Sequence, residues 1–343
     1  MMEETGTLAW SNGHEVSAMS SALAAFEAER PALFGVAYRM LGSASEAEDI
    51  LQEAWLRWQA TDASSIRSPH SFLVTMVTRL ALDQLRSARA RREQYVGPWL
   101  PEPVAITSSG RDDPETAAET FESISLAFLV VLERLAPIER AVFLLHDVFD
   151  YGYPEIAEIV GKSETACRQV LSRARRRVAE GRPRFAANNE ARRRLTERFV
   201  RVAEEGDVAS MVDLLTEDIT VYTDGGGKVA AALNPLHGRD AILRFWLHFS
   251  EQYDITLRSG EVNGGPGVYM YLDGRLDSVF VLEGDGERIH EVYVVRNPDK
   301  LAAIRRELEP GGLEQPRGDA RARHVAVAEG AGDGAVGQDG PFE

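Results

Sequence analysis

The pattern of residues between Ser163 and Val178 predicts a helix, and one polar face of this helix carries the side chains best suited to binding chemistry. Arg can bridge the N7 and O6 acceptors of guanine and Gln can pair with adenine, each good pair contributing about 1–3 kcal/mol of discrimination between bases. Side chains three or four positions apart share one surface of a helix, and those at such spacings are Thr165, Arg168, Gln169, Ser172, Arg173 and Arg176. This face predicts a recognition helix that reads base edges in the major groove of DNA.

The residues around this segment predict a helix-turn-helix that would position it. Pro154 suits the first turn of a preceding helix, because its missing N–H would be unpaired there anyway. Gly161 predicts the end of that helix, and Ser163 predicts the cap of the next one. The apolar stripe that would face the core repeats every four residues and consists of Ala166, Val170, Ala174 and Val178. The alternative is a solvated basic helix in some other helical bundle.

The charge of the chain is unevenly distributed. A net charge of −16 argues against nucleic acid as a partner, yet residues 162–194 hold eleven Lys and Arg against three Glu, and residues 79–92 hold five Arg against one Asp. Two basic segments in an acidic chain indicate two surfaces that contact phosphates. The candidate DNA contacts of the earlier segment are Arg79, Asp83, Arg86, Arg89, Arg91 and Arg92, and Ser163 joins those of the later one.

An acidic surface precedes the first basic segment. Residues 46–59 predict a helix with an apolar stripe of Ala47, Ile50, Leu51, Ala54 and Trp58. Its outward positions are Glu48, Asp49, Gln52 and Glu53. An exposed acidic face beside a basic domain favours binding of a basic protein partner. The alternative is an ordinary solvated helix face.

Composition shifts along the chain divide it into six parts. We expect a flexible arm over 1–20, a helical domain over 21–95, a proline-rich linker over 96–118, a second helical domain over 119–183, an α+β domain over 184–308 and a disordered tail over 309–343. The α+β assignment depends on helices near 188–215 and 239–251, followed by four β-rich runs that Gly and Asp-Gly pairs separate.

The sequence also predicts the compartment. One cysteine, Cys167, excludes an internal disulfide framework and is best explained as a small packing residue; a redox role is the alternative. The first thirty residues carry no signal segment and no run is long enough to span a membrane, so we expect a cytoplasmic protein with no membrane contact. No ligand spacing among the seven histidines indicates a metal, and we expect neither metal nor cofactor.

Three stretches of the helical domains resemble a known family. AEDILQEAWLRW (47–58), the stretch from Ser68 to Glu93 and the stretch from Glu133 to Val178 resemble the conserved regions of bacterial sigma factors of the extracytoplasmic function (ECF) group. The resemblance implies a monomer that binds core RNA polymerase through the β′ clamp helices and the β flap. It further implies that the first domain melts and reads the minus-ten element of promoter DNA and that the second reads the minus-thirty-five element.

Three short motifs narrow the resemblance to the ECF41 subgroup, related to SigJ-type factors, which carry a C-terminal SnoaL-like, NTF2-like extension. The motifs are WLPEP, DGGGK and NPDKL, and the regulatory residues they imply are Trp99, Leu100, Pro101, Asp224, Gly225, Gly226, Gly227, Lys228, Asn297, Pro298, Asp299, Lys300 and Leu301. The extension implies a cone with a curved, mainly antiparallel sheet that regulates in place of a separate anti-sigma factor. We expect both polar, turn-like motifs at the surface, contacting the sigma domains or their linker, and a linker that spans the two helical domains without packing as a rigid hinge.

An enzyme is the competing interpretation of the third domain. Its titratable candidates are Asp224, His237, Asp240, Tyr222, His248 and His290, yet no pattern defines a nucleophile, a metal site or paired carboxylates, and Asp-Gly-Gly-Gly is first of all a turn. We therefore expect no catalysis.

The third domain also has aromatic residues that could line a pocket: Tyr222, Phe245, Trp246, Tyr269 and Phe280. Most of them are expected in the core, and binding of a small ligand in such a pocket is left as an open alternative. The alternative function is a helix-turn-helix regulator fused to a small-molecule-binding or catalytic domain.

Overall fold

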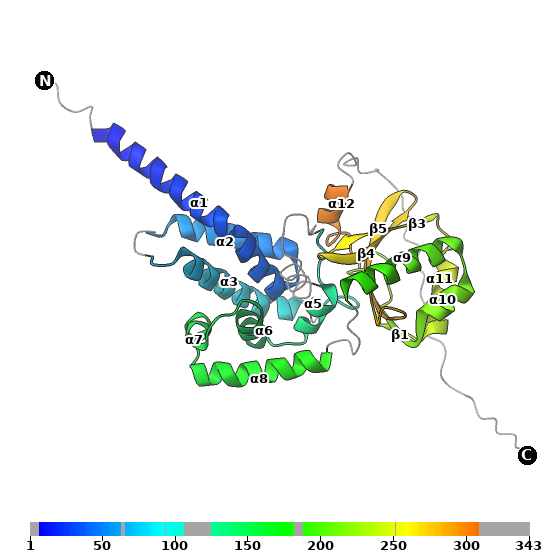
Figure 1. Cartoon of the computed structure of the whole chain (residues 1–343). Helices are drawn as coiled ribbons and strands as arrows, with labels where there is room; N and C mark the ends of the chain where they lie inside the picture. Colours follow the sequence, from blue (N-terminus) through cyan, green and yellow to red (C-terminus); the bar gives the residue numbers. More distant parts are fainter. Residues whose placement is uncertain are drawn as a thin grey trace, which may run out of the picture. The chain divides into compact units, whose positions relative to one another are not determined.

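The computed structural model describes residues 7–62, 66–92, 94–105, 125–181, 188–250 and 252–308, with the side chains of 7–21 and 88–92 excluded. These ranges form two helical domains followed by an α+β domain (Figure 1), as the sequence predicts. Within them, no helix combines the length and the apolar character that crossing a membrane requires.

The first helical domain consists of α1 (Thr7–Leu41), α2 (Ala44–Gln59) and α3 (Pro69–Arg92). The prediction of a flexible arm over 1–20 is wrong from Thr7 onward, where the backbone is helical. Despite weak helix formers such as Asn12 and Gly13, this stretch extends the helix that packs in the core from Ala22 onward. The Ser43 side chain caps α2 by accepting a hydrogen bond from the Glu46 N–H. The buried face of α2 contains the predicted stripe, with Trp58 among the largest fully buried side chains.

The second helical domain consists of α5 (Leu126–Glu133), α6 (Pro137–Phe143), a π-helical turn (Leu144–Val148), α7 (Tyr153–Val160) and α8 (Glu164–Gly181). Gly161 ends α7 in the left-handed conformation at φ 66°, and the Ser163 hydroxyl accepts from the Ala166 N–H at 3.2 Å. The predicted helix-turn-helix is therefore present. The buried stripe of α8 differs in one respect: Ala166 is half-buried, because Cys167 and Leu171 widen the apolar face on one side.

The α+β domain begins with two helices and continues as a sheet. Its elements are α9 (Asn189–Glu205), α10 (Val208–Leu214), β1 (Leu215–Asp224), β2 (Leu236–His237), α11 (Arg239–Ser250), β3 (Ile255–Val262), β4 (Gly265–Leu272), β5 (Arg275–Gly284), β6 (Ile289–Val295) and α12 (Ala302–Leu308). The described strands form one open, mixed sheet in the order β2-β1-β6-β5-β4-β3. Only the β1–β6 pairing among them is parallel, so the mainly antiparallel expectation is confirmed.

The two faces of this sheet pack against different partners. Alternate residues such as Val268, Phe280 and Val292 face a core that α9, α10 and α11 complete (Figure 1). The intervening residues, such as Val279 and Tyr293, join a second cluster with Leu100 of the linker, Leu126 of α5 and Ile304 of α12. The second face therefore receives the linker, and the site described next lies at its edge.

Candidate functional site

The carboxylate of Asp224 lies at the end of β1 and is fully buried. It accepts hydrogen bonds from the Tyr95 hydroxyl at 2.5 Å, from the Leu100 backbone N–H at 2.8 Å and from the Lys300 ammonium at 2.7 Å. Lys300 also donates to the Leu100 carbonyl oxygen, and its ammonium lies 4.0 Å from the centre of the Trp99 ring. One buried ion pair therefore holds both backbone groups of a linker residue.

Asn297 completes this cluster from the end of β6. Its backbone N–H donates to the Asp224 carbonyl oxygen at 2.8 Å, and its side-chain amide donates to the Tyr95 hydroxyl at 2.8 Å. Burial, and next the hydrogen bond to the Asp224 carboxylate, raise the pKa of Tyr95, so the phenol stays protonated and can donate. Parallel pairing of Asp224 with Val295 explains why the DGGGK and NPDKL motifs meet.

The glycines of DGGGK allow this close approach. Gly226 has φ 61°, and a Cβ there would overlap the Asn297 amide and approach the Tyr95 hydroxyl to 2.9 Å. A Cβ on Gly225 would lie 2.6 Å from the Val229 carbonyl oxygen. Side chains at either position would therefore push the motif away from its partners.

The predicted surface location of the two motifs is wrong for their central residues. Asp224, Asn297 and Lys300 are buried because the motifs and the linker cover one another, and the Leu301 side chain lies in the core. Lys228 and Asp299 do match the expectation, since they form an exposed ion pair with each other. The structure brings together Asp224, Gly226, Asn297, Lys300, Trp99 and Leu100 of the predicted set.

A second cluster, missed at the sequence level, holds the linker four residues further along. The buried Asn263 donates its N–H to the Val104 carbonyl at 2.8 Å and accepts from the Val104 N–H at 3.1 Å. Its side-chain amide donates to the Tyr38 hydroxyl of α1 at 2.7 Å, and that hydroxyl donates to the Glu102 carbonyl at 2.7 Å. Asn263 and Gly264 form the β3–β4 turn at φ 54° and 74°. An Asn-Gly pair between β-rich runs predicts such a turn, but not its partners.

The side chain of Glu102 attaches the linker to the first helical domain. Its carboxylate accepts from the Ser43 and Ser45 hydroxyls at 2.9 and 3.0 Å and from the Ser45 N–H at 3.1 Å, at the start of α2, where negative charge is favoured. The expected spanning linker is therefore wrong for residues 100–104, which are buried. Apolar Leu100 and Val104 and the satisfied Glu102 account for that burial. We call the two clusters together the linker lock: Tyr38, Tyr95, Leu100, Glu102, Val104, Asp224, Asn263, Asn297 and Lys300.

The predicted recognition face is exposed on α8. Thr165, Arg168, Gln169, Ser172, Arg173 and Arg176 are all exposed, as is the capping Ser163. The Arg168 guanidinium pairs with Glu164 at 2.9 Å and lies 4.7 Å from the centre of the Tyr153 ring. This arrangement leaves the polar face of the helix accessible to a ligand of groove dimensions.

The predicted contacts on α3 are only partly free. The Arg79 guanidinium donates to the Glu158 and Ile159 carbonyls of α7 at 2.9 and 3.1 Å, so it joins the two helical domains. Arg86 pairs with Asp83 at 2.8 Å, and both are exposed. The side chains of Arg89, Arg91 and Arg92 lie outside the described residues. Arg140 of α6 adds a second link between the domains by donating to the Met40 carbonyl at 2.7 Å.

The acidic face of α2 is present as predicted. Asp49, Gln52 and Glu53 are exposed, and Glu48 is half-buried. Glu48 pairs with Arg30 at 2.5 Å, and Glu53 pairs with Arg57 at 2.8 Å. Ion pairs this exposed are weak, so both carboxylates remain available to a basic partner.

An apolar cavity of about 100 Å³ lies between α11 and the sheet. Its walls include Phe245, Trp246 and Phe280 of the aromatic candidates, whereas Tyr222 stacks on Tyr293 and Tyr269 donates to the Glu261 carbonyl. Among the described residues, none of the six titratable candidates for catalysis lines this cavity. The enzyme interpretation therefore receives no support from the cavity.

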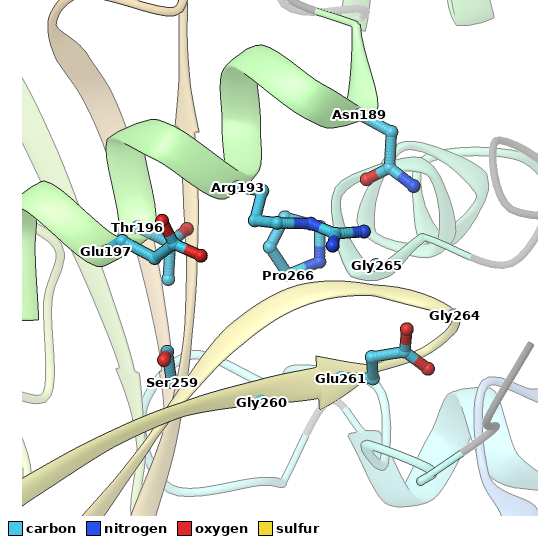
Figure 2. Close-up of a pocket in the computed structure, with 10 residues that line it drawn as sticks. All are labelled: Asn189, Arg193, Thr196, Glu197, Ser259, Gly260, Glu261, Gly264, Gly265 and Pro266. Atoms are coloured by element: carbon cyan, nitrogen blue, oxygen red, sulfur yellow. The ribbon is translucent and has the colours of Figure 1, made fainter.

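A second, more polar pocket of about 160 Å³ flanks the β3–β4 turn. Figure 2 shows Asn189 and Arg193 of α9 on one side and Glu261 with the Gly264–Gly265 backbone on the other. Charges of both signs line it, which selects no single class of ligand.

Glu283 of β5 is buried beside Arg192, which donates to it at 2.6 Å. Burial raises the pKa of Glu283 to about 7, against the lowering effect of Arg192. A carboxyl with a raised folded-state pKa binds a proton more tightly in the folded protein, so it destabilises the fold progressively as pH rises from about 4.5 to 7. We expect the free energy of unfolding to be lower by about 3 kcal/mol above pH 7 than at low pH because of this group. The substitution Glu283→Gln should remove this pH dependence. Urea unfolding at pH 5 and 8 measures the difference, and an unchanged pH dependence in Glu283→Gln would contradict this assignment.

Comparisons with known proteins agree with this architecture. Residues 25–91 match the Sigma-70 region 2 family, residues 125–178 match Sigma-70 region 4 and residues 196–303 match the SnoaL-like domain. The ECF RNA polymerase sigma factor SigJ of Mycobacterium tuberculosis is 39% identical over 291 residues, which cover 80% of this chain and 92% of SigJ. The probable ECF sigma factor SigI of the same species is 31% identical, over 84% of this chain and 97% of SigI.

A solved structure extends the agreement to the fold. The crystal structure of Mycobacterium tuberculosis SigJ superposes with a TM-score of 0.65 at 35% identity, covering 82% of this chain and 98% of that one. Identity and coverage of this extent, together with both sigma regions and the SnoaL-like domain in the same order, show that this chain belongs to the family of extracytoplasmic function RNA polymerase sigma factors.

Proposed function

We propose that this sigma factor directs core RNA polymerase to promoter DNA and that its SnoaL-like domain restrains it through the linker lock. The observation that carries the proposal is the buried Asp224 carboxylate, which binds the Leu100 N–H of the linker between the two sigma domains. Suppressing activity a hundredfold requires the restrained state to be favoured by only about 2.7 kcal/mol. A few buried, charge-assisted hydrogen bonds are sufficient for this.

Promoter recognition belongs to the two helical domains. Sigma domains imply binding of core RNA polymerase and promoter DNA, and the α8 face supports reading of the minus-thirty-five element. The α3 arginines are assigned to the minus-ten element and the α2 acidic face to the β′ clamp helices, with region 4 on the β flap. We propose that the protein acts in the cytoplasm and is a monomer when free.

The contact of Arg79 supports a restrained state. Its guanidinium commits Nε and one terminal nitrogen to the Ile159 and Glu158 carbonyls, which holds α3 against α7. Full engagement of Arg79 with a DNA phosphate would compete with these bonds and loosen the contact between the two sigma domains. Glu102 holds the linker to the first sigma domain and Asn263 holds it to the SnoaL-like domain, so the linker cannot extend freely when the two sigma domains move apart.

The test is transcription in vitro with core RNA polymerase, promoter DNA and the full chain carrying Asn263→Gly. Glycine keeps the left-handed turn and removes only the side-chain amide that bonds Tyr38 and Val104. We expect about a tenfold rise in transcript, equal to about 1.4 kcal/mol of lost restraint.

The matched control is Asp273→Gly, because Asp273 occupies the same left-handed position (φ 51°) in the exposed β4–β5 turn. Equal transcription from the Asn263 variant and the unchanged chain would refute the restraint. Absence of transcription from any promoter with core enzyme would refute the sigma activity itself, and footprinting of promoter DNA without core enzyme would favour the alternative, a stand-alone DNA-binding regulator.

A further inference from the structure

We propose that the apolar cavity of the SnoaL-like domain is a receptor site for an uncharged, apolar molecule about the size of one aromatic ring, and that its occupancy tightens the linker lock. The second half of this statement rests on the proposed role of the lock. The first half stands on the cavity alone.

The walls of the cavity define the chemistry of the ligand. They are formed largely by aliphatic and aromatic side chains, with Phe199, Trp246 and Phe249 on the helical side. A volume of about 100 Å³ is of the order of engineered apolar cavities that stay dry and take up benzene or xenon. A ligand in this cavity would therefore be held by contacts with carbon atoms and not by hydrogen bonds.

The two polar side chains in the walls are already satisfied. Thr223 accepts from the Ala232 N–H at 2.8 Å and donates to the Ala232 carbonyl at 3.2 Å. The Arg296 guanidinium binds both carboxylate oxygens of Asp277, at 2.8 and 2.9 Å, and the Ala230 carbonyl at 2.6 Å. An anionic ligand would compete with Asp277 for Arg296 and would lose its hydration among apolar walls, so the site selects against charge.

The same wall residues adjoin the linker lock. Thr223 precedes Asp224 in β1, and Arg296 precedes Asn297 after β6. The wall segment at Ala232 and Leu233 also contacts the linker from its outer side, because a Cβ on Gly97 would lie 3.7 Å from the Ala232 carbonyl oxygen and from the Leu233 Cα. The cavity is therefore separated from the linker by a single layer of backbone.

This arrangement sets the direction of the effect. A ligand that packs against the walls as they stand in the locked state binds that state more tightly, and this difference in affinity shifts the population toward it. Packing against Ala232 and Thr223 holds their backbones in the positions that present Asp224 to Leu100. Occupancy should thus slow the opening of the lock and reduce transcription.

The test uses toluene as the probe and the full chain. Binding is measured by calorimetry, and opening of the lock is measured by hydrogen exchange of the Leu100 amide. At a toluene concentration of about ten times its Kd, exchange should slow by about tenfold, the limit for a ligand that binds only the locked state. Benzoate, which adds a charge to the same ring, should not bind.

Two variants locate the effect. Val292→Phe places a ring in the cavity and should abolish toluene binding, whereas Val208→Phe, at an exposed position on α10, should leave it unchanged. Thr223→Val keeps the shape of the wall but removes its bonds to Ala232, so toluene should bind and Leu100 exchange should no longer respond.

Three results would overturn the proposal: no toluene binding by the unchanged chain, equal binding by Val292→Phe, or binding that leaves Leu100 exchange unaltered. None of them depends on transcription. If toluene binds and slows exchange while Asn263→Gly leaves transcription unaltered, the receptor site stands and the proposed function fails.

Discussion

Lys300→Met should raise promoter-dependent transcription about a hundredfold, whereas Lys228→Met should change it less than about fivefold. Both lysines pair with an aspartate from the motif opposite their own, but Lys300 and Asp224 are buried while Lys228 and Asp299 are exposed. Removing one partner of a buried pair costs about 3–5 kcal/mol, because the other charge is left buried and unpaired. An exposed pair contributes about 0–1 kcal/mol.

The measurement is in vitro transcription with core RNA polymerase at equal concentrations of the folded variants, which thermal unfolding establishes. Methionine preserves the aliphatic length of lysine, so the packing against Trp99 is retained while the charge is removed. A similar effect of both substitutions would show that motif charge in general, and not the buried pair, restrains the protein.

Arg168→Ala should weaken binding of the holoenzyme to its promoter by about 5- to 150-fold and relax its choice of base in the upstream element, because one bidentate base contact contributes about 1–3 kcal/mol. Arg175→Ala is the control, since Arg175 lies exposed on the same helix but its Nε and one terminal nitrogen bind both carboxylate oxygens of Asp147, at 2.8 and 2.6 Å. The two variants lose the same formal charge.

The readout is the affinity for the native promoter and for promoters with single changes in the upstream element, at one fixed salt concentration. Arg168→Ala should lose discrimination at one base position, whereas Arg175→Ala should weaken binding to all sequences alike. If Arg168→Ala also weakens all sequences equally, Arg168 contacts phosphate and the predicted base reading is wrong.

Local signals in the sequence predicted most elements of this fold, but not the short strand β2 or the helix α12. Gly161 and Ser163 define the turn of the helix-turn-helix, because one permits a left-handed residue and the other caps a helix. The β-rich runs that become β4 to β6 predicted the strands, but their alternation did not predict that both faces of the sheet are covered. The widened stripe of α8 and the helical start of α1 depend on packing and on context that no short window contains.

The linker lock was predictable only in part. Its motifs identified Leu100, Asp224, Asn297 and Lys300 as a set, but the polar, turn-like character of DGGGK and NPDKL suggested a surface. Burial of those residues follows from mutual satisfaction of charges and backbone groups that lie up to 202 residues apart in sequence. For Asn263 the sequence predicted only a turn. Its hydrogen bond to Tyr38 could not be predicted, because the two residues are 225 positions apart and no local pattern connects them.

The parallel pairing of β1 with β6 has a consequence for the protein during its synthesis. Asp224 can meet Lys300 only after 76 further residues have been added, including the whole of β6, which pairs with β1. At about 5–20 residues per second the ribosome needs about 4–15 s for that stretch. Both sigma domains have been synthesised by then, so each newly made molecule passes through an interval in which its promoter-reading surfaces exist before the restraint that acts on them.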